Sequence, residues 1–228
     1  MEKIKKVVII SGTSSGIGHY LASKLCKNNT VLGFSRSRTN IKNKNYFHHI
    51  LDINNYLKTQ KFINKVYTKF KRIDVLINNA GTNISHGNFY FLKKDLVEQT
   101  INTNLISKIL FTNRVVKFMI PKKKGKIINI GSSAVGMLPI GDSVYAASKA
   151  GLEVFSKILS KELKEFKISS NLISPFLVET PMIKKISHDT INNILKKKNK
   201  KKNNLNEVLK IVEKIMSQSR INSKNFYL

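Results

Sequence analysis

The sequence has a single cysteine, Cys26, among its 228 residues. One cysteine cannot form a disulfide within the chain, and this usage is typical of a reducing compartment. Cys26 follows Ile17, Leu21 and Leu25 at helical spacing. We therefore expect a buried thiol whose role is packing.

Long hydrophobic runs are also missing, because no apolar stretch reaches the roughly 18–20 residues that a membrane-spanning helix needs. The opening MEKIKKVVII places lysines before an apolar run, as a secretory signal does. That run is four residues long and SGTSSG follows it, which does not fit a signal peptide. We expect a cytoplasmic protein without a membrane segment.

Acidic residues are scarce: 13 stand against 41 basic ones, for a net charge of +28. Such a charge is compatible with a polyanionic partner such as nucleic acid. However, 36 of the 41 basic residues are lysine, they are spread along the chain, and asparagine is abundant too. An AT-rich genome produces this composition whatever the function, so the charge alone does not indicate a nucleic-acid partner.

Short apolar runs alternate with segments of helical periodicity. The alternation predicts right-handed crossovers and an α/β fold, a Rossmann-type doubly wound parallel sheet of about seven strands in three layers. We expect residues 1–228 to form a single domain. The predicted strands are 6–11, 30–34, 47–52, 73–78, 125–130 and 168–173, with FYL at 226–228 as a seventh.

The clearest predicted helix covers about 143–166, and a shorter amphipathic one covers 205–216. Between them lies a Lys/Asn-rich segment, about 181–206, that we expect to be mobile. The apolar stripe expected on the first of these helices consists of Val144, Ala147, Gly151, Val154, Ile158 and Leu163.

A glycine-rich loop, SGTSSGIG at 11–18, follows the first predicted strand and opens the first helix. Gly12 allows a tight turn, Gly16 lets the backbone approach a phosphate, and Gly18 permits close helix–strand packing. The helix N-terminus offers unpaired N–H groups to a pyrophosphate. These features predict a dinucleotide site formed by Gly12, Thr13, Ser14, Ser15, Gly16, Ile17 and Gly18.

The end of the second predicted strand indicates which dinucleotide would bind. A carboxylate there would hold the ribose 2′-hydroxyl of NAD(H), but this chain has GFSRSR at 33–38. The planar guanidinium of Arg36 suits a 2′-phosphate. We therefore expect NADP(H), with NAD(H) as the alternative and with no metal.

A tyrosine four residues before a lysine is a candidate proton-transfer pair, and Tyr145 and Lys149 are distinguished by Ser132, thirteen residues upstream at a strand end. On a helix the two side chains share a face. Strand carboxyl ends are where open α/β sheets form their sites. The same spacing without such a serine occurs at Tyr20/Lys24, Tyr67/Lys71 and Tyr90/Lys94.

Six motifs in order make the chain resemble the short-chain dehydrogenase/reductase family over nearly its whole length. They are the glycine loop, Asp52 and Ile53 in LDI, NNAG at 78–81, Asn104 in INTNLIS, the Ser132/Tyr145/Lys149 set, and SPFLVETPM at 174–182. Within that family, the motifs of this chain most resemble those of 3-oxoacyl-[acyl-carrier-protein] reductases.

This resemblance implies the roles of the matching residues. Tyr145 would be the general acid, with its pKa lowered by Lys149 and by the oxidised nicotinamide. Ser132 would bond the substrate carbonyl, and Asn104 would seat a water that relays protons from Lys149. The cofactor would contact Asp52, Ile53, Asn79, Ala80, Gly81, Tyr145, Lys149, Pro175, Val178 and Thr180.

Fewer sequence features bear on the substrate and on the oligomeric state than on the cofactor. Phe176 replaces the family's glycine and would crowd the nicotinamide or form an apolar substrate wall. By the same resemblance, the helices of Asn104 and Tyr145 would form a homodimer interface. Members of the family usually continue through a glycine-bearing tail after the last strand, where this chain has KNFYL at 224–228, so a tetramer is left open. An acyl-carrier-bound or small carbonyl compound is the expected substrate. A sugar or surface-glycan precursor and a non-catalytic cofactor-sensing or nucleic-acid-binding protein are the alternatives.

Overall fold

The computed structural model describes residues 5–181, 183 and 202–228, and a seven-stranded parallel sheet is its centre. The spatial order is β3-β2-β1-β4-β5-β6-β7, which confirms the predicted doubly wound fold. The order reverses between β1 and β4, where such sheets form a crevice. The strands are β1 (Val7–Ser11), β2 (Thr30–Ser35), β3 (Tyr46–Ile50), β4 (Val75–Asn78), β5 (Gly125–Ile130), β6 (Ile168–Ser174) and β7 (Asn225–Tyr227).

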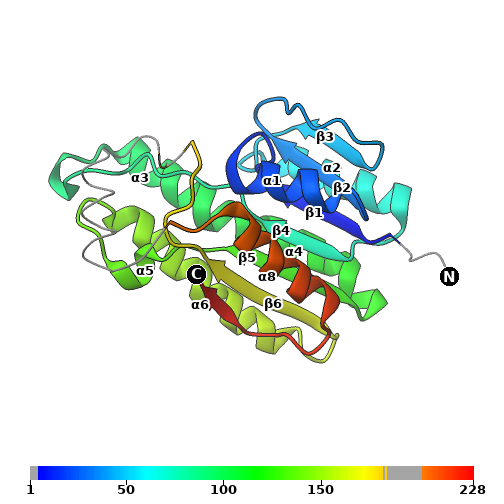
Figure 1. The fold of residues 1–228 in the computed structure, drawn as a ribbon. Coiled ribbons are helices and arrows are strands. Elements are labelled where there is room, and N and C mark those ends of the chain that lie inside the picture. The colour runs from blue at the N-terminus through cyan, green and yellow to red at the C-terminus, as the bar shows by residue number, and fades with distance from the viewer. Residues whose placement is uncertain (1–4, 182, 184–201) are drawn as a thin grey trace.

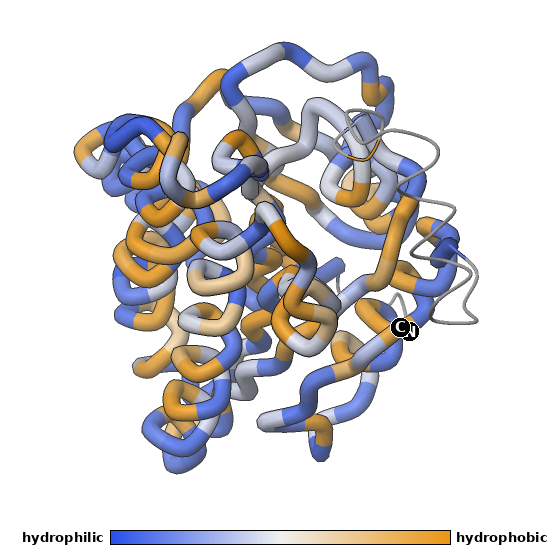
Figure 2. Tube along the Cα trace, turned by 90° about the vertical axis from the view of Figure 1, so that its left-hand side faces the viewer, coloured by the Kyte–Doolittle hydropathy of each residue, from blue (hydrophilic) through white to orange (hydrophobic). Residues whose placement is uncertain are grey.

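Helices cover both faces of the sheet (Figure 1). On one face lie α1 (Gly16–Leu25) and α8 (Leu205–Ser217). On the other lie α2 (Tyr56–Phe70), α4 (Ser107–Met119) and α6 (Ser143–Glu162). Each face has its own apolar core, and Figure 2 shows hydrophobic and hydrophilic residues alternating along the helices, as amphipathic helices require.

Short elements project beyond the sheet on the left of Figure 1. They include α3 (Lys94–Ile101) and α5 (Ala134–Met137). A π-helical turn, η2 (Asn102–Ile106), joins α3 to α4, and such turns are frequent at functional sites. The 3₁₀ turns are η1 (Phe89–Phe91) and η3 (Ile120–Lys122).

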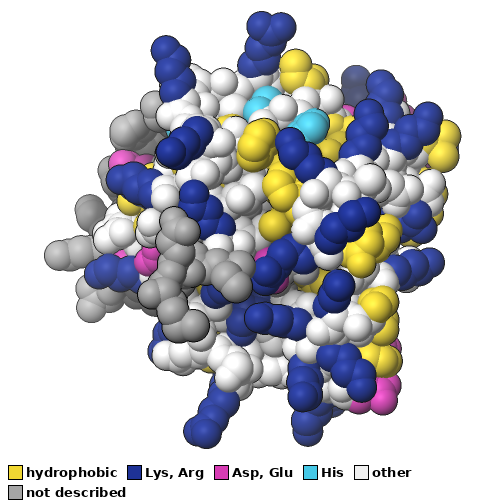
Figure 3. All heavy atoms as spheres, turned by 90° about the vertical axis from the view of Figure 1, so that its right-hand side faces the viewer, with side chains coloured by type: hydrophobic (Ala, Val, Ile, Leu, Met, Phe, Trp, Pro, Cys, Tyr) yellow, Lys and Arg dark blue, Asp and Glu magenta, His cyan; other side chains and the backbone are white. Residues whose placement is uncertain are grey.

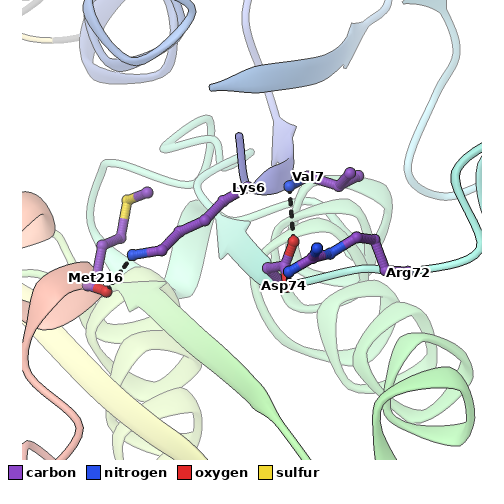
Figure 4. Close-up of polar contacts among 5 residues, drawn as sticks. All are labelled: Lys6, Val7, Arg72, Asp74 and Met216. Atoms are coloured by element: carbon purple, nitrogen blue, oxygen red, sulfur yellow. Dashed lines mark hydrogen bonds and ion pairs between the residues drawn. The ribbon is translucent and has the colours of Figure 1, made fainter. Parts of the chain in front are cut away.

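The amino end of β1 is fixed by polar contacts far from that crevice (Figure 4). The Val7 amide donates to Asp74 Oδ2 over 2.8 Å, and Arg72 holds Asp74 Oδ1 at 2.7 Å. Lys6 Nζ donates to the Met216 carbonyl over 2.6 Å and so joins the start of β1 to the end of α8. All of these bonds lie at the amino end of β1, so none of them occupies the carboxyl ends of the strands.

The apolar stripe predicted on the long helix is wrong. Val154 is 55% exposed and Ile158 is 50% exposed, whereas the buried face of α6 carries several serines. The reason is that buried hydroxyls find partners here: Ser156 Oγ accepts from Asn129 Nδ2 at 3.1 Å and lies 2.9 Å from Ser170 Oγ. Val154 and Ile158 therefore lie on the outer face of α6, whereas Val144 and Leu152 are buried.

These serines belong to a chain of buried hydrogen bonds that crosses three strands. Asn78 Nδ2 donates to Thr112 Oγ1 and to Asn129 Oδ1, each over 2.8 Å. With Ser156 and Ser170 these residues form what we call the polar ladder, which connects α4, β4, β5, α6 and β6. The ladder lies directly beneath the carboxyl edge, because Asn78 is the last residue of β4.

Most of the Lys/Asn-rich segment, including all of 184–201, lies outside the described residues, so its mobility stays a prediction. At its far end, Asn203 forms a parallel bridge with Val178. Its Oδ1 accepts from the Phe176 amide at 2.8 Å. The start of α8 is thereby tied to the loop that follows β6.

The basic residues do not gather in one place on the face that Figure 3 shows, where lysines and arginines are scattered among other side chains.

Cys26 is buried, as predicted, and burial raises the pKa of its thiol. In the described part of the chain, no helix combines the length and apolar character needed to cross a membrane.

Candidate active site

A cavity of about 370 Å³ opens at the carboxyl ends of the central strands. Its walls bring together residues that the sequence motifs place far apart in the chain. The predicted residues that line it are Gly12, Ser14, Ser15, Gly16, Ile17, Arg36, Asp52, Ile53, Asn79, Ala80, Gly81, Tyr145, Lys149 and Thr180. Within 5–181, 183 and 202–228, no cluster of three or more His, Cys, Asp or Glu side chains suits a metal ion.

The glycine loop is built tightly between β1 and α1. Gly12 and Gly16 have φ of +76° and +58°, a backbone region that favours glycine. A Cβ on Gly18 would collide with the Gly12 carbonyl oxygen and with Asn79 Nδ2. Asn79 Nδ2 in turn donates to the Ser11 carbonyl at 2.9 Å and to that of Gly12 at 3.1 Å, so two loops form one braced unit.

The N-terminus of α1 is open toward this cavity. Its N-cap residue, Ser15, makes no side-chain capping bond, and the first turn contains no acidic residue. Unpaired N–H groups and the positive end of the helix dipole favour an anion at such a position. The cradle therefore fits a pyrophosphate group.

The far end of the cavity is basic at one point and acidic at another. Arg36 follows β2 and is exposed, while the buried Ser35 hydroxyl donates to the Ser37 carbonyl at 2.9 Å. Asp52 Oδ1 accepts from the Asn54 amide at 2.9 Å. Arg36 thus has its guanidinium available to a ligand.

Thr13 supports the loop from behind rather than lining the cavity. The Tyr46 hydroxyl donates to Thr13 Oγ1 over 2.9 Å, and His48 Nδ1 lies 3.0 Å from the same hydroxyl. The sequence analysis missed Tyr46 and His48. Their only sequence signal is the strand pattern of β3, which says nothing about a contact with Thr13.

Tyr145 and Lys149 both line the cavity from one face of α6. Lys149 Nζ donates to the Ile130 carbonyl over 3.0 Å and lies 5.6 Å from the centre of the Tyr145 ring. Burial lowers the pKa of Lys149 to about 8.

The expected lowering of the Tyr145 pKa includes the charge of the oxidised nicotinamide and stays a prediction, whereas the protein on its own acts in the opposite direction. Burial of the phenol raises its pKa, the Ser132 hydroxyl acts against that rise, and the charge of Asp142 adds to it. Lys149 faces the ring of Tyr145, and the desolvation of the phenol dominates. Asp142 itself is bound by His86 Nδ1 at 2.8 Å.

Asn104 is fully buried inside the π-helical turn. Its Oδ1 accepts from the Thr82 amide at 2.9 Å, and its Nδ2 donates to the Thr82 carbonyl and to Ser148 Oγ. Its side chain therefore joins the loop after β4 to α6. Ser132 Oγ accepts from the Ala134 amide at 3.2 Å, at the start of α5.

The remaining predicted residues lie close to the cavity without lining it. Pro175 and Val178 are buried after β6, and from the described part of that segment Thr180 and Pro181 reach the wall. Phe176 is buried nearby and is not part of the wall either. The other Tyr/Lys pairs lie elsewhere: Tyr67, for example, stacks on Phe118 with ring centres 4.4 Å apart.

One buried residue of this region had no place in the sequence analysis. Lys108 lies on α4, one turn after Asn104, and is completely buried. Its spacing from Asn104 is the signal that could have identified it. In a chain with 41 basic residues, a lysine at that spacing does not by itself indicate a buried residue.

Comparison with known proteins agrees with the geometry. The seven-stranded parallel sheet with a cavity at its carboxyl edge is a Rossmann-type architecture. Residues 6–191 match the family described as short chain dehydrogenase. The chain therefore belongs to the short-chain dehydrogenase family and is an oxidoreductase.

Individual relatives give more detail. A 3-oxoacyl-[acyl-carrier-protein] reductase, FabG, of Buchnera aphidicola subsp. Baizongia pistaciae is 36% identical over 205 residues, which are 86% of this chain and 83% of that protein. The structure of ElxO with NADP bound has a TM-score of 0.88 at 24% identity, covering 98% and 97% of the two chains. The 3-oxoacyl-[acyl-carrier protein] reductase from Brucella melitensis in complex with NAD also gives 0.88, at 23% identity, covering 99% and 96%.

Proposed function

We propose that this oxidoreductase uses NADP(H) to reduce the carbonyl group of a 3-oxoacyl thioester. The observation that carries the proposal is the single cavity in which Tyr145 and Lys149 meet the glycine loop and Arg36. The similarity to the Buchnera reductase, whose name specifies a 3-oxoacyl-[acyl-carrier-protein] substrate, supports the choice of substrate.

Different residues of the cavity would bind different parts of the cofactor. The open N-terminus of α1 and the backbone of Gly12 and Gly16 would hold the pyrophosphate. Arg36 would pair with a 2′-phosphate, whereas Asp52 and its neighbour Ile53 would contact the adenine. Thr180 lines the cavity beside Gly16, and it would hold the carboxamide of the nicotinamide.

The bound cofactor supplies the hydride, and this chain's residues supply the proton. Tyr145 would donate its hydroxyl proton to the carbonyl oxygen, because its raised pKa keeps the phenol protonated near neutral pH. Ser132 would bond the same carbonyl oxygen. Lys149 would then return a proton to Tyr145 through the buried end of the cavity, next to Asn104.

We also propose a homodimer formed through α4 and α6. Four large apolar side chains on η2, α4 and α6 are between 43% and 55% exposed: Ile106, Leu110, Val154 and Ile158. Adjacent apolar side chains of this kind are favourable only when another surface covers them. A second copy of the same face would cover them with matching apolar groups.

The decisive experiment is a panel of carbonyl compounds offered with NADPH and followed at the nicotinamide absorbance. A 3-oxoacyl thioester, on coenzyme A or on an acyl carrier protein, should be reduced fastest. A sugar ketone of similar size serves as the matched comparison. Preferred turnover of the sugar would refute the thioester assignment, and no turnover of any carbonyl would refute the reductase.

A further inference from the structure

A glycine inside a buried strand, Gly33 of β2, makes room for a cluster of polar side chains. A Cβ on Gly33 would lie 2.7 Å from Thr13 Oγ1 and closer still to the Tyr46 hydroxyl. Glycine within a strand often marks such a close approach. The partner of Gly33 on the edge strand β3 is His48, whose ring completes the cluster (Figure 1).

His48 connects this cluster to the turn that carries Arg36. Its Nε2 lies 3.0 Å from the Ser37 carbonyl oxygen. Its Nδ1 lies 3.0 Å from the Tyr46 hydroxyl and 3.4 Å from Thr13 Oγ1. A carbonyl oxygen can only accept a hydrogen bond, so Nε2 carries the hydrogen. In the neutral ring, Nδ1 is then an acceptor for a hydroxyl group.

The hydroxyl groups of the cluster fit that acceptor. The buried Tyr46 hydroxyl donates to Thr13 Oγ1 over 2.9 Å. The hydrogen of the Thr13 hydroxyl is thereby left to donate to His48 Nδ1. A continuous path of hydrogen bonds therefore leads from the glycine loop through His48 to the backbone at Ser37.

This path joins the two places at which the proposed cofactor carries phosphate. Thr13 belongs to the loop that would hold the pyrophosphate, and Ser37 directly follows Arg36, which would pair with the 2′-phosphate. The Ser37 carbonyl also accepts from the Ser35 hydroxyl at 2.9 Å, but that bond closes the turn only locally. The bond from His48 fixes the turn to a neighbouring strand.

Another contact holds the same loop further along the chain. His19 Nε2 on α1 lies 2.8 Å from Asn40 Oδ1. Asn40 stands four residues beyond Arg36, whereas Ser37 is its immediate neighbour. The contact of His48 therefore acts more directly on the backbone from which the Arg36 side chain extends.

We propose that His48 is a positioning residue for cofactor selection, whose bond to the Ser37 carbonyl holds the backbone of Arg36 where the guanidinium meets the 2′-phosphate of NADP(H). The inference rests on the proposed function, because it assumes that Arg36 selects NADP(H). Arg36 is exposed, and ordering a long exposed side chain during binding lowers affinity. A turn that is already fixed leaves less to be ordered. NAD(H) has no 2′-phosphate and gains nothing from this contact.

The test replaces His48 by two amides that each keep one side of the ring. The side-chain nitrogen of glutamine reaches the position of histidine Nε2, so His48→Gln keeps a donor to the Ser37 carbonyl. Asparagine is one carbon shorter, and its amide reaches only the position of Nδ1. His48→Asn therefore keeps a partner for the hydroxyl groups and loses the donor. Fluorescence titrations with NADPH and NADH, without substrate, give both dissociation constants for each variant.

The expected result is a selective loss. In His48→Asn the affinity for NADPH should fall about three- to tenfold, the effect of one neutral hydrogen bond, while that for NADH changes less than about twofold. His48→Gln should keep the wild-type ratio of the two affinities. His49→Phe is the control, because the His49 ring packs on the core residue Phe62 with ring centres 4.9 Å apart. It should leave both dissociation constants unchanged.

A double-mutant cycle asks whether His48 acts through Arg36. In an Arg36→Ala background, His48→Asn should cause no further loss of NADPH affinity. An effect that persists undiminished in that background overturns the proposal. An equal loss for both cofactors in His48→Asn, which a merely structural role would produce, also overturns it. So does a ratio in His48→Gln that falls as far as in His48→Asn.

The wild-type ratio separates this inference from the proposed function. If the wild type prefers NADPH and His48→Asn keeps that preference, only the role of His48 fails. If the wild type binds both cofactors equally, the assignment of NADP(H) fails and the role of His48 fails with it. The titrations contain no carbonyl compound, so a wrong substrate assignment leaves their result intact.

Discussion

Replacing Gly18 by alanine tests how tightly the cofactor cradle is built. The added Cβ would collide with the Gly12 carbonyl oxygen and Asn79 Nδ2, and it would come within 2.9 Å of the Gly12 carbonyl carbon. Two of these atoms are backbone, and the third is held by the bonds from Asn79 to Ser11 and Gly12. The methyl group therefore cannot be accommodated by turning a flexible side chain.

The magnitude follows from the cost of overpacking, about 1–3 kcal/mol. At roughly 3 °C for each kcal/mol in a chain of this size, thermal unfolding should occur about 3–9 °C lower. The displaced loop should also lose at least one charge-assisted hydrogen bond to the pyrophosphate, which weakens NADPH binding by about ten- to a hundredfold. Differential scanning calorimetry and fluorescence titration with NADPH measure the two effects.

Gly136→Ala is the matched control, because a Cβ at Gly136 on α5 meets nothing within 4 Å. Alanine is also the better helix former by about 1 kcal/mol, so the control should be as stable as the wild type or slightly more so. If Gly18→Ala melted with its control and bound NADPH normally, the reasoning from the braced loop would be refuted.

Three further outcomes are expected. Tyr145→Phe should lower kcat by about a hundredfold or more in steady-state assays and leave NADPH binding nearly unchanged, because it removes only the transferable proton. Ser35→Asp combined with Arg36→Ala should invert the cofactor preference in binding titrations, since the arginine contact is worth roughly ten- to a hundredfold. Val154→Glu should weaken the dimer about 30-fold or more in light-scattering measurements, because it buries a charge in the apolar face.

Each of these outcomes has a control and a contrary result. Tyr67→Phe, far from the cavity, should keep activity within a few fold, and retention of more than about a tenth of the rate in Tyr145→Phe would remove its role as acid. Equal wild-type affinities for NADPH and NADH would refute the role of Arg36 in binding the 2′-phosphate. Leu57→Glu, an exposed apolar position on α2, should leave the mass unchanged. A dimer that persists in Val154→Glu places the interface elsewhere.

The fold was predictable because its strands are covered on both faces and therefore appear as uninterrupted apolar runs. Strands β1 and β4, for example, are buried at every position. The cofactor end of the site was also predictable, because the requirement of Gly12 for a positive φ leaves a mark in the sequence.

The buried face of α6 could not be predicted in the same way. Hydrophobic periodicity assigns serine to the surface, but Ser156 and Ser160 are buried because the Ser156 hydroxyl meets side chains of β5 and β6 and the Ser160 hydroxyl donates to the Lys157 carbonyl. Lys108 also escaped prediction, because a lysine is expected at the surface and its neighbours in the chain do not indicate that it is buried. Such partners become visible only when the elements are packed together.

The polar ladder has a consequence for how the molecule comes apart. Separating α4 from the sheet would break the bond from Asn78 to Thr112, and separating α6 would break the bond from Asn129 to Ser156, which adds the loss of a buried hydrogen bond to the cost of exposing apolar surface. Neither helix can then open by itself at low free energy. Strands β4, β5 and β6, together with both helices, should exchange their amide hydrogens as one cooperative unit near the global unfolding free energy, while β3 at the sheet edge exchanges through smaller fluctuations.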